Sequence, residues 1–272
     1  MGQRVPREGV YSDRDMGKPN ARSKTRRRSA VPPSPPNGPP KNRLLASLKA
    51  SDLARLLPDL QAIPLTVKHV FQKRGAPIRY VWFPNGGVCS VTAMMKNGAA
   101  VEVATVGDEG MLGMSAFFGG TAMPGESMLQ VPSQRPDEMT TQRLTIAAFR
   151  REINRHGALH DCINRYSRGM IALMMQSTAC MALHTVQQRC CRWLLMTHDR
   201  IRSDEFTLSQ EFLAMMLGST RPTVTLVARG LQQKGLIRYV HARMTILDRS
   251  GLEAAACECY ATITAECDRL GL

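Results

Sequence analysis

The sequence lacks the patterns that mark membrane and secreted proteins. No stretch approaches the roughly 18 consecutive apolar residues of a membrane-spanning helix, and the basic N-terminus has no apolar core of signal-peptide length. The 272 residues include eight cysteines, but not in the dense framework of a short, disulfide-stabilised secreted domain. These absences argue against a membrane protein and favour a chain that works in a reducing, cytoplasmic setting.

Common catalytic signatures are missing as well. There is no His-x-His pair of the kind used by barrel metalloenzymes, no Gly-x-Ser-x-Gly motif and no phosphate-binding Gly-x-x-x-x-Gly-Lys loop. His156 and His160 are four residues apart, as are Cys180 and His184, and either pair could ligate a metal from one helix face. Neither pair has two further ligands nearby in sequence. We therefore expect no metal, no cofactor and no enzyme; a barrel enzyme or scaffold is the less favoured alternative.

The other cysteines have no spacing that points to a site. Cys190-Cys191 and Cys257-x-Cys259 both lack the Cys-x-x-Cys spacing of zinc and redox motifs. We expect buried, unreactive thiols. Redox sensing by one of these cysteines is the alternative.

Positive charge is abundant but unevenly distributed. The formal charge of the chain is +14, and residues 1–43 hold 11 Lys and Arg against 3 Asp and Glu. Six of the nine residues 32–40 are proline, so no packed element is expected there. We expect residues 1–43 to be a disordered basic leader; a nonspecific DNA-binding arm and a downstream translation start are the alternatives. The remaining mild positive charge is compatible with nucleic acid, whose phosphates supply much of the affinity of DNA-binding proteins.

Residues 206–248 are the most informative stretch and predict two short helices. Ser209 is a candidate hydroxyl N-cap, and apolar residues follow it at helical spacing up to Gly218, which can adopt the left-handed backbone of a helix end. A second helix has Pro222 in its first turn, where a missing N–H costs nothing. Two short helices joined by a tight, glycine-containing turn form a helix-turn-helix.

The second helix has the surface expected of a DNA reader. Its polar, β-branched face suits contact with phosphates and base edges; a helical hairpin buried in a core is the alternative. Two strands around an arginine-bearing tip, at residues 236–239 and 244–247, have the pattern of a wing. We therefore predict a DNA-binding winged helix that contacts DNA through Ser209, Ser219, Thr220, Arg221, Thr223, Thr225, Arg229, Arg238, His241 and Arg243.

The N-terminal half predicts a series of short strands after one or two short helices in residues 44–60. Asn97-Gly98 lies between two alternating runs and is a strong hairpin signal. Many short strands at this spacing favour a small antiparallel barrel or jelly roll. We expect the strands at residues 65–71, 79–83, 88–95, 100–106, 127–131 and 143–146.

A helical region is expected at residues 147–185, and it carries a heptad pattern. Seven positions spaced alternately three and four residues apart sustain this pattern for three repeats. We favour a two-fold dimer axis along them; a helix buried against its own barrel is the alternative. This heptad seam consists of Ile163, Tyr166, Met170, Leu173, Ser177, Cys180 and His184.

The order of barrel, long helix and winged helix-turn-helix resembles the Crp/Fnr family of bacterial transcription regulators. The resemblance covers roughly residues 44–260, and its most specific carriers lie at 208–223 and 235–237. The segments VGDEGMLG at 106–113 and QQRCCRWLL at 187–195 are similar to one branch of the family.

The resemblance implies an α+β protein with an N-terminal antiparallel β-barrel, a long dimerisation helix and a C-terminal winged helix-turn-helix. It further implies a homodimer on double-stranded DNA, with RNA polymerase and an unidentified small-molecule effector as further partners. The corresponding boundaries are a leader at 1–43, a sensory barrel at 44–150, a dimerisation helix at 151–185 and a DNA-binding domain at 186–272.

The expected ligand pocket departs from the members of the family that bind cyclic nucleotides. Those members use a Gly-Glu pair and an Arg-Ser-Ala stretch, whereas a glutamate replaces the arginine here and would repel a phosphate. Iron–sulfur and haem members are disfavoured too, because the first cysteine is Cys89 and residues 101–131 hold no Cys or His. A cyclic-nucleotide-responsive regulator is therefore the runner-up. The residues of this degenerate pocket are Gly113, Met114, Glu126, Ser127 and Met128.

The recognition helix combines one match with two departures. Arg221 matches the family arginine that reaches guanine, a contact worth about 1–3 kcal/mol of discrimination. Pro222 replaces the usual glutamate, and Leu226 replaces a later arginine. We therefore expect a DNA sequence different from the family consensus, with Thr223 and Thr225 on phosphate or thymine methyl groups.

Overall fold

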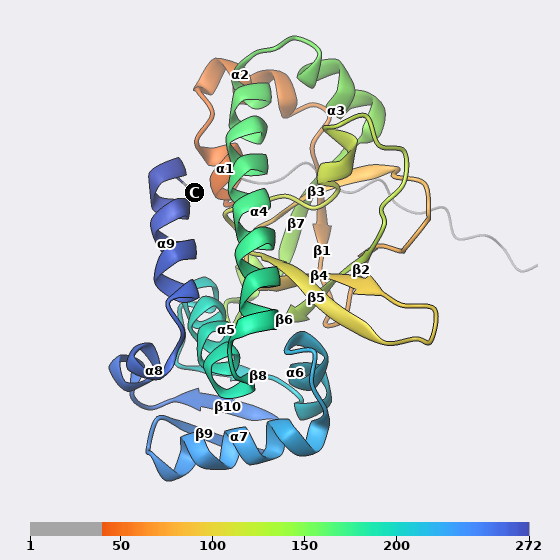
Figure 1. Ribbon diagram of the computed structural model, residues 1–272. Coiled ribbons are helices and arrows are strands. Elements are labelled where there is room, and N and C mark those ends of the chain that lie inside the picture. The colour runs from red at the N-terminus through yellow and green to blue at the C-terminus, as the bar shows by residue number, and fades with distance from the viewer. Residues whose placement is uncertain (1–39, 272) are drawn as a thin grey trace, which may run out of the picture. The chain divides into compact units, whose positions relative to one another are not determined.

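Two antiparallel sheets make up the first half of the fold in a computed structural model that describes residues 40–271 (Figure 1). Side chains from both sheets pack into one shared core. The first sheet contains, in spatial order, β1 (Gln61–Pro64), β7 (Thr140–Thr145) and β3 (Tyr80–Pro84). The second contains β2 (Val70–Gln72), β6 (Glu126–Val131), β4 (Val88–Met94) and β5 (Ala100–Val106).

The strands agree with the sequence prediction at five of the six expected places. Asn97-Gly98 forms the turn between β4 and β5, where Gly98 has a φ of 84°. The prediction of a strand at residues 65–71 is wrong, because β1 ends at Pro64 and β2 begins at Val70. Lys68 between them has a φ of 64°, a left-handed turn conformation that breaks the extended backbone.

The first two helices, α1 (Arg43–Ala46) and α2 (Ala50–Leu56), are short. Asn42 is fully buried: its side chain accepts a hydrogen bond from Leu45 N and donates to the carbonyls of Pro84 and Gly110. The folded part therefore begins before residue 43, where the leader was expected to end. Residues 1–39 of that leader lie outside the described residues.

The expected helical region at 147–185 consists of two helices, so the single helix expected at 151–185 is interrupted near its start. A four-residue break that contains His156 and Gly157 separates α3 (Ile146–Ile153) from the long α4 (Ala158–Leu183). Thr185 then forms a capping box with Gln188 and starts α5 (Val186–Ile201). Two residues thus connect the longest helix to the C-terminal domain.

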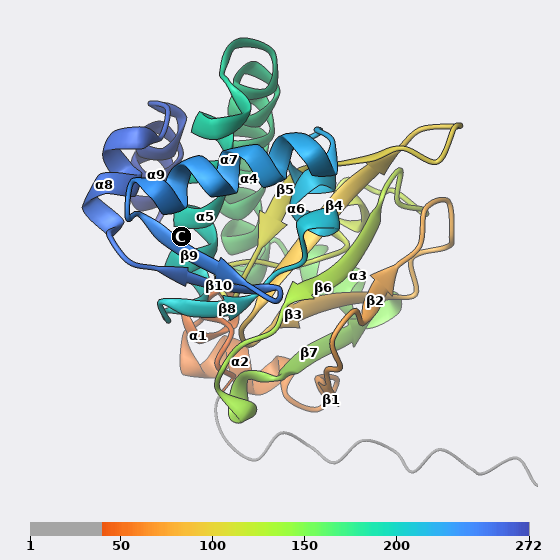
Figure 2. The same cartoon turned by 90° about the horizontal axis from the view of Figure 1, so that it is seen from below.

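The C-terminal domain has the predicted winged helix-turn-helix and one strand more than expected. Its three-stranded sheet has the order β8-β10-β9, and α7 lies beside β9 (Figure 2). Two further helices follow this sheet. The elements are β8 (Glu205–Thr207), α6 (Gln210–Met216), α7 (Arg221–Gln233), β9 (Ile237–Val240), β10 (Arg243–Ile246), α8 (Arg249–Ala255) and α9 (Cys259–Leu270).

Two hydrophobic clusters form most of the core. One joins the two sheets to α1–α4 and includes Ile263 of α9, which lies alongside α4 (Figure 1). The other is the core of the winged helix, and it includes Val88 and Val131 from the sheet of β4 and β6. The predicted α+β architecture is confirmed. None of the helices in residues 40–271 combines the length and apolar character that a membrane crossing requires.

Candidate nucleic-acid interface and sensory pocket

The helix-turn-helix is built by local signals in the sequence. The hydroxyl of Ser209 accepts a hydrogen bond from Phe212 N at 3.1 Å and caps α6. Gly218 ends this helix with a φ of 55°, and a Cβ at this position would collide with Met181 of α4. Thr220 caps α7 and accepts a hydrogen bond from Thr223 N at 3.4 Å.

The exposed face of α7 carries fewer free polar groups than the sequence predicted. Arg221 and Arg229 are exposed, but the hydroxyl of Thr225 donates to Arg221 O and lies 3.0 Å from Gln210 Oε1. The hydroxyl of Thr223 is 2.9 Å from that of Thr220. Leu226 is 66% exposed in the middle of this face. The face therefore combines two arginines with an apolar centre that could contact thymine methyl groups.

The tip of the wing lies beside the start of α7. His241 and Ala242 have φ values of 49° and 61° and form the two-residue turn between β9 and β10. Arg238 is exposed, whereas Arg243 forms an ion pair of 3.1 Å with Glu205. A groove of about 310 Å³ runs between wing and helix, and it is lined by Ser209, Gln210, Glu211, Arg221, Tyr239, His241 and Ala242.

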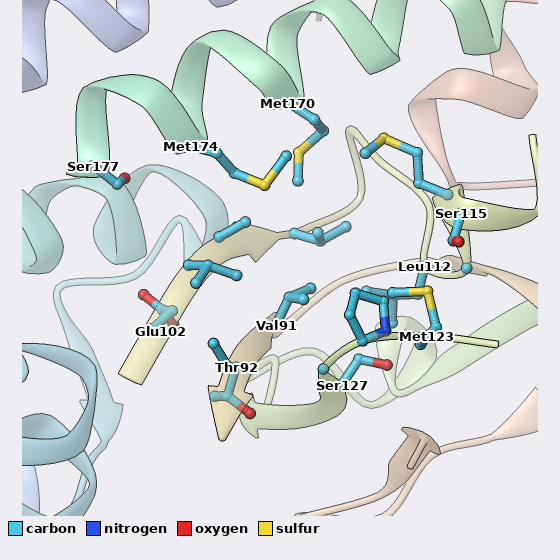
Figure 3. A pocket seen from close by; sticks show the side chains of 18 of the residues that line it. Val91, Thr92, Glu102, Leu112, Ser115, Met123, Ser127, Met170, Met174 and Ser177 are labelled. Atoms are coloured by element: carbon cyan, nitrogen blue, oxygen red, sulfur yellow. The ribbon is translucent and has the colours of Figure 1, made fainter. Parts of the chain in front are cut away.

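A cavity of about 720 Å³ lies between the four-stranded sheet and α4 (Figure 3). Gly113, Met114 and Ser127 line this cavity, as the sequence predicted, but Glu126 and Met128 are not among its lining residues. Neighbours in a strand point to opposite faces, so Ser127 of β6 faces the cavity while Glu126 and Met128 do not. The expected repulsion of a phosphate by Glu126 therefore has no structural basis.

The lining of the cavity is apolar apart from a few groups. Met170 and Met174 of α4 face the sheet across it (Figure 3). Among the lining side chains that the structure describes, Glu102 of β5 is the only ionisable one. The hydroxyl of Ser127 is buried without a hydrogen-bond partner in residues 40–271. A cavity with one carboxylate and no cation is poorly suited to a phosphate and better suited to a neutral, largely apolar molecule.

Glu102 also connects the cavity to the winged helix. Its carboxylate accepts hydrogen bonds from the hydroxyl of Ser90 at 2.5 Å and from the indole Nε1 of Trp193 in α5 at 2.8 Å. Burial raises the pKa of Glu102 to about 7, although these hydrogen bonds and nearby arginines oppose the shift. Nothing in the local sequence indicated this residue, because its partners are 12 and 91 positions away.

Two ion pairs fasten the loop at residues 106–113 to the end of α5. Glu109 lies 2.9 Å from Arg200, with both side chains largely buried, and Asp108 lies 2.6 Å from Arg202. Burial alone would raise the pKa of Glu109, but the Arg200 guanidinium brings it below its ordinary value. These ion pairs form one contact between the loop that follows β5 and the end of α5.

The heptad seam does not face outward, so its expected role is corrected. Five of its residues are buried within the chain, against the sheets and α9, because α4 has neighbours on both of these sides. Ser177 lines the cavity, and His184 is the C-cap residue beyond the helix. The buried five are Ile163, Tyr166, Met170, Leu173 and Cys180.

A different face of α4 is exposed. We call Ile171, Met175, Thr178, Ala182 and Leu183 the exposed strip. Ile171 is 45%, Met175 69% and Leu183 79% exposed. The first four residues are spaced 4-3-4, so the strip runs along one side of the helix.

One group of potential metal ligands was missed by spacing arguments. The donor atoms of Cys180, His184, Cys257 and Cys259 all lie within 4.8 Å of one another. The rings of His156 and His160 are 4.8 Å apart, but in the described chain this pair belongs to no group of three or more ligands.

Comparison with known proteins gives the C-terminal domain a family. Residues 188–255 match the Crp-like helix-turn-helix domain. No curated protein sequence matches the chain.

Solved structures share the fold of most of the described chain. A Crp/Fnr-family transcriptional regulator from Eubacterium rectale has a TM-score of 0.62 at 15% identity, over 79% of this chain and 98% of that one. FixK2 from Bradyrhizobium japonicum has a TM-score of 0.61 at 12% identity, over 73% of this chain and 98% of that one. The c-di-GMP-responsive global regulator CLP from Xanthomonas campestris has a TM-score of 0.60 at 13% identity, over 73% of this chain and 99% of that one. Residues 188–255 thus form a Crp-like helix-turn-helix domain within a fold that these regulators share.

Proposed function

We propose that the chain acts as a homodimer that reads a palindromic DNA site in two successive major grooves. The observation that carries this proposal is the exposed face of α7, which begins with Arg221 and lies beside the wing. In dimeric helix-turn-helix proteins the two recognition helices enter grooves about 34–36 Å apart. Each α7 would then contact one half-site.

The exposed strip of α4 is the proposed dimer interface. Its three large apolar side chains have no cover within residues 40–271. Pairing two such strips around a two-fold axis would bury them, and burial of apolar surface is the main driving force of association. The heptad seam would then support the interface from behind, since it holds α4 against the sheets and α9.

Arg221 is the proposed base reader, whereas Ser209 and His241 would hold the phosphate backbone from the groove between α7 and the wing. Ser219, Thr220 and Thr223 would position the start of α7. The remaining expected contacts, from Thr225, Arg229, Arg238 and Arg243, belong to the same proposal.

The cavity beneath α4 is the proposed effector site. Its apolar lining and unpartnered Ser127 hydroxyl favour a neutral ligand with one hydrogen-bonding group. An effector can act only by binding the DNA-competent and incompetent states with different affinity. The proposal includes no enzymatic activity, a cytoplasmic location with the chromosomal DNA, and RNA polymerase as a further partner.

Selection of genomic DNA fragments by the purified full-length protein, followed by sequencing, tests the proposal. We expect enrichment of a palindrome with half-sites one helical turn apart. Sequence-independent, salt-sensitive binding that persists with Arg221→Ala would contradict specific reading by α7. An enriched but non-palindromic site would contradict the symmetric dimer alone.

A further inference from the structure

Four potential metal ligands meet where α4 ends. Cys180 lies in the last turn of α4, and His184 is the C-cap residue of that helix. Cys257 lies between α8 and α9, and Cys259 is the first residue of α9. The three cysteines are buried and form a small cluster apart from the two large hydrophobic cores. This cluster joins the end of α4, just before α5, to the C-terminal helices.

The distances within this cluster suit a single ion. The Sγ atoms of Cys180 and Cys257 are 3.5 Å apart, and Sγ of Cys259 is 3.5 Å from Nδ1 of His184. Donor atoms bound tetrahedrally at about 2.0–2.3 Å from zinc lie roughly 3.3–3.8 Å from one another. Since no two of the four donors are more than 4.8 Å apart, small side-chain rotations would complete such a shell.

Two neighbouring polar side chains contact the potential ligands through hydrogen bonds or ion pairs. Nε2 of His184, the ring nitrogen that points away from Cys259, lies 3.1 Å from a carboxylate oxygen of Glu258. A carboxylate in this position fixes the orientation and tautomer of a metal-binding histidine. Gln176 donates a hydrogen bond from Nε2 to Sγ of Cys259 at 3.0 Å, which would stabilise a thiolate.

A buried cation lies close to the same cluster. Arg192 is 7% exposed, its Nε has no hydrogen-bond partner among the described residues, and its Nη1 contacts the sulfur of Met196 at 3.3 Å. Its charge acts on Cys180, although burial is the larger influence on that thiol and raises its pKa. A buried guanidinium requires a negative neighbour. Glu102, on which the charge of Arg192 also acts, is one such neighbour, and three thiolates around a divalent ion, with a net charge of −1, would provide a second.

We propose that Cys180, His184, Cys257 and Cys259 bind one zinc ion in a closed site with three thiolates and one imidazole. Three thiolates and one imidazole in tetrahedral geometry favour zinc over magnesium, calcium or manganese. Binding displaces three thiol protons to solvent and forms three Zn–S bonds and one Zn–N bond. Because all four positions come from the protein, the ion has a structural role: it ties the end of α4 to α8 and α9.

Metal analysis of the full-length protein, purified in reducing buffer without chelator, tests the proposal. We expect one zinc ion per chain, and cobalt(II) substitution should produce the visible bands of tetrahedral thiolate coordination. Cys257→Ser and Cys259→Ser should each lose the zinc. Cys267→Ser is the matched control, because Cys267 lies on α9 outside the cluster, and it should keep one zinc ion per chain.

A chelator experiment on the wild-type protein separates loss of metal from loss of folding. Removal of zinc should lower the Tm of the wild type, and adding zinc back should restore it, because an ion bound only by the folded state stabilises that state. Reduced, folded protein without any bound transition metal would overturn the proposal. So would zinc retained at one ion per chain in Cys257→Ser, or a Cys180–Cys257 disulfide in metal-free protein.

Discussion

The carboxylate of Glu102 and the indole of Trp193 are joined by a hydrogen bond of 2.8 Å that links strand β5 to helix α5. Glu102 lines the proposed effector cavity, and Trp193 is buried in the core of the winged helix. One residue therefore contacts both the space where a ligand would bind and the winged helix. A ligand that displaces or protonates Glu102 would act directly on this link.

Glu102→Gln should remove a pH dependence of stability. Since burial raises the pKa of Glu102 to about 7, the folded state holds a proton that the unfolded chain releases near pH 4.5. This contribution to stability is full below pH 4.5 and is lost as the pH rises to 7. The glutamine variant, which resembles the protonated side chain, should be about 1–3 kcal/mol more stable than wild type above pH 7. Urea unfolding at pH 5 and pH 8 measures the difference, and the exposed Glu211→Gln should show none.

Arg200→Met should destabilise the protein strongly. It leaves the largely buried Glu109 carboxylate without its partner, at a cost of about 3–5 kcal/mol. The double variant Arg200→Met/Glu109→Leu should recover much of this loss, because no buried charge remains. Additive losses in this double-mutant cycle would contradict the coupling. The pKa of Glu109 is lowered, so the contribution of the pair is present above pH 4.5 and disappears in acid, opposite to Glu102.

Arg221→Ala and Arg238→Ala should weaken DNA binding in different ways. Loss of a base contact by Arg221 should relax specificity at one base pair per half-site by about 1–3 kcal/mol. Loss of Arg238, which lies in the wing, should weaken binding to all sequences and reduce the salt dependence. Binding titrations on the selected site and its single-base variants, at two salt concentrations, distinguish the two patterns. A uniform loss from both substitutions would contradict this division.

Met175→Glu should dissociate the proposed dimer. Met175 is 69% exposed in the middle of the exposed strip, and two glutamates facing each other across a two-fold axis would repel. Light scattering should then give the mass of one chain. Met95→Glu is the control, since Met95 is 54% exposed just after β4 and this variant should leave the mass unchanged.

Leu173→Ala, in the heptad seam, should instead cost about 2–5 kcal/mol of folding stability.

Features that depend on neighbouring residues were predictable from the sequence. Ser209, Gly218 and Thr220 act within one helical turn of their own positions, so their capping and turn roles follow from local chemistry. The strand pattern and the Asn97-Gly98 hairpin are local in the same sense. Long-range partners were not predictable: Cys180 and Cys257 are separated by 77 positions, and only the packing of α9 against α4 brings them together.

Periodicity located the buried face of α4 but not the surface that buries it. A 3-4 spacing looks the same whether the neighbour is a second copy or the sheets and α9 of the same chain. The pocket prediction had a related weakness. Glu126 and Ser127 are adjacent in β6, and alternation along the strand brings only Ser127 to the cavity.

Leu226 is a water-exposed hydrocarbon in the middle of the surface that would meet DNA. If α7 enters the major groove, this side chain is dehydrated on binding, whereas the arginines around it exchange counterions. Dehydration of Leu226 lowers the heat capacity of the complex, and its contribution to affinity is insensitive to salt. The contribution of the arginines to affinity decreases as the salt concentration rises. Calorimetry on the specific site should therefore show a negative heat-capacity change that Leu226→Ala reduces. In cells whose ionic strength varies, such a contact would keep part of the selectivity constant.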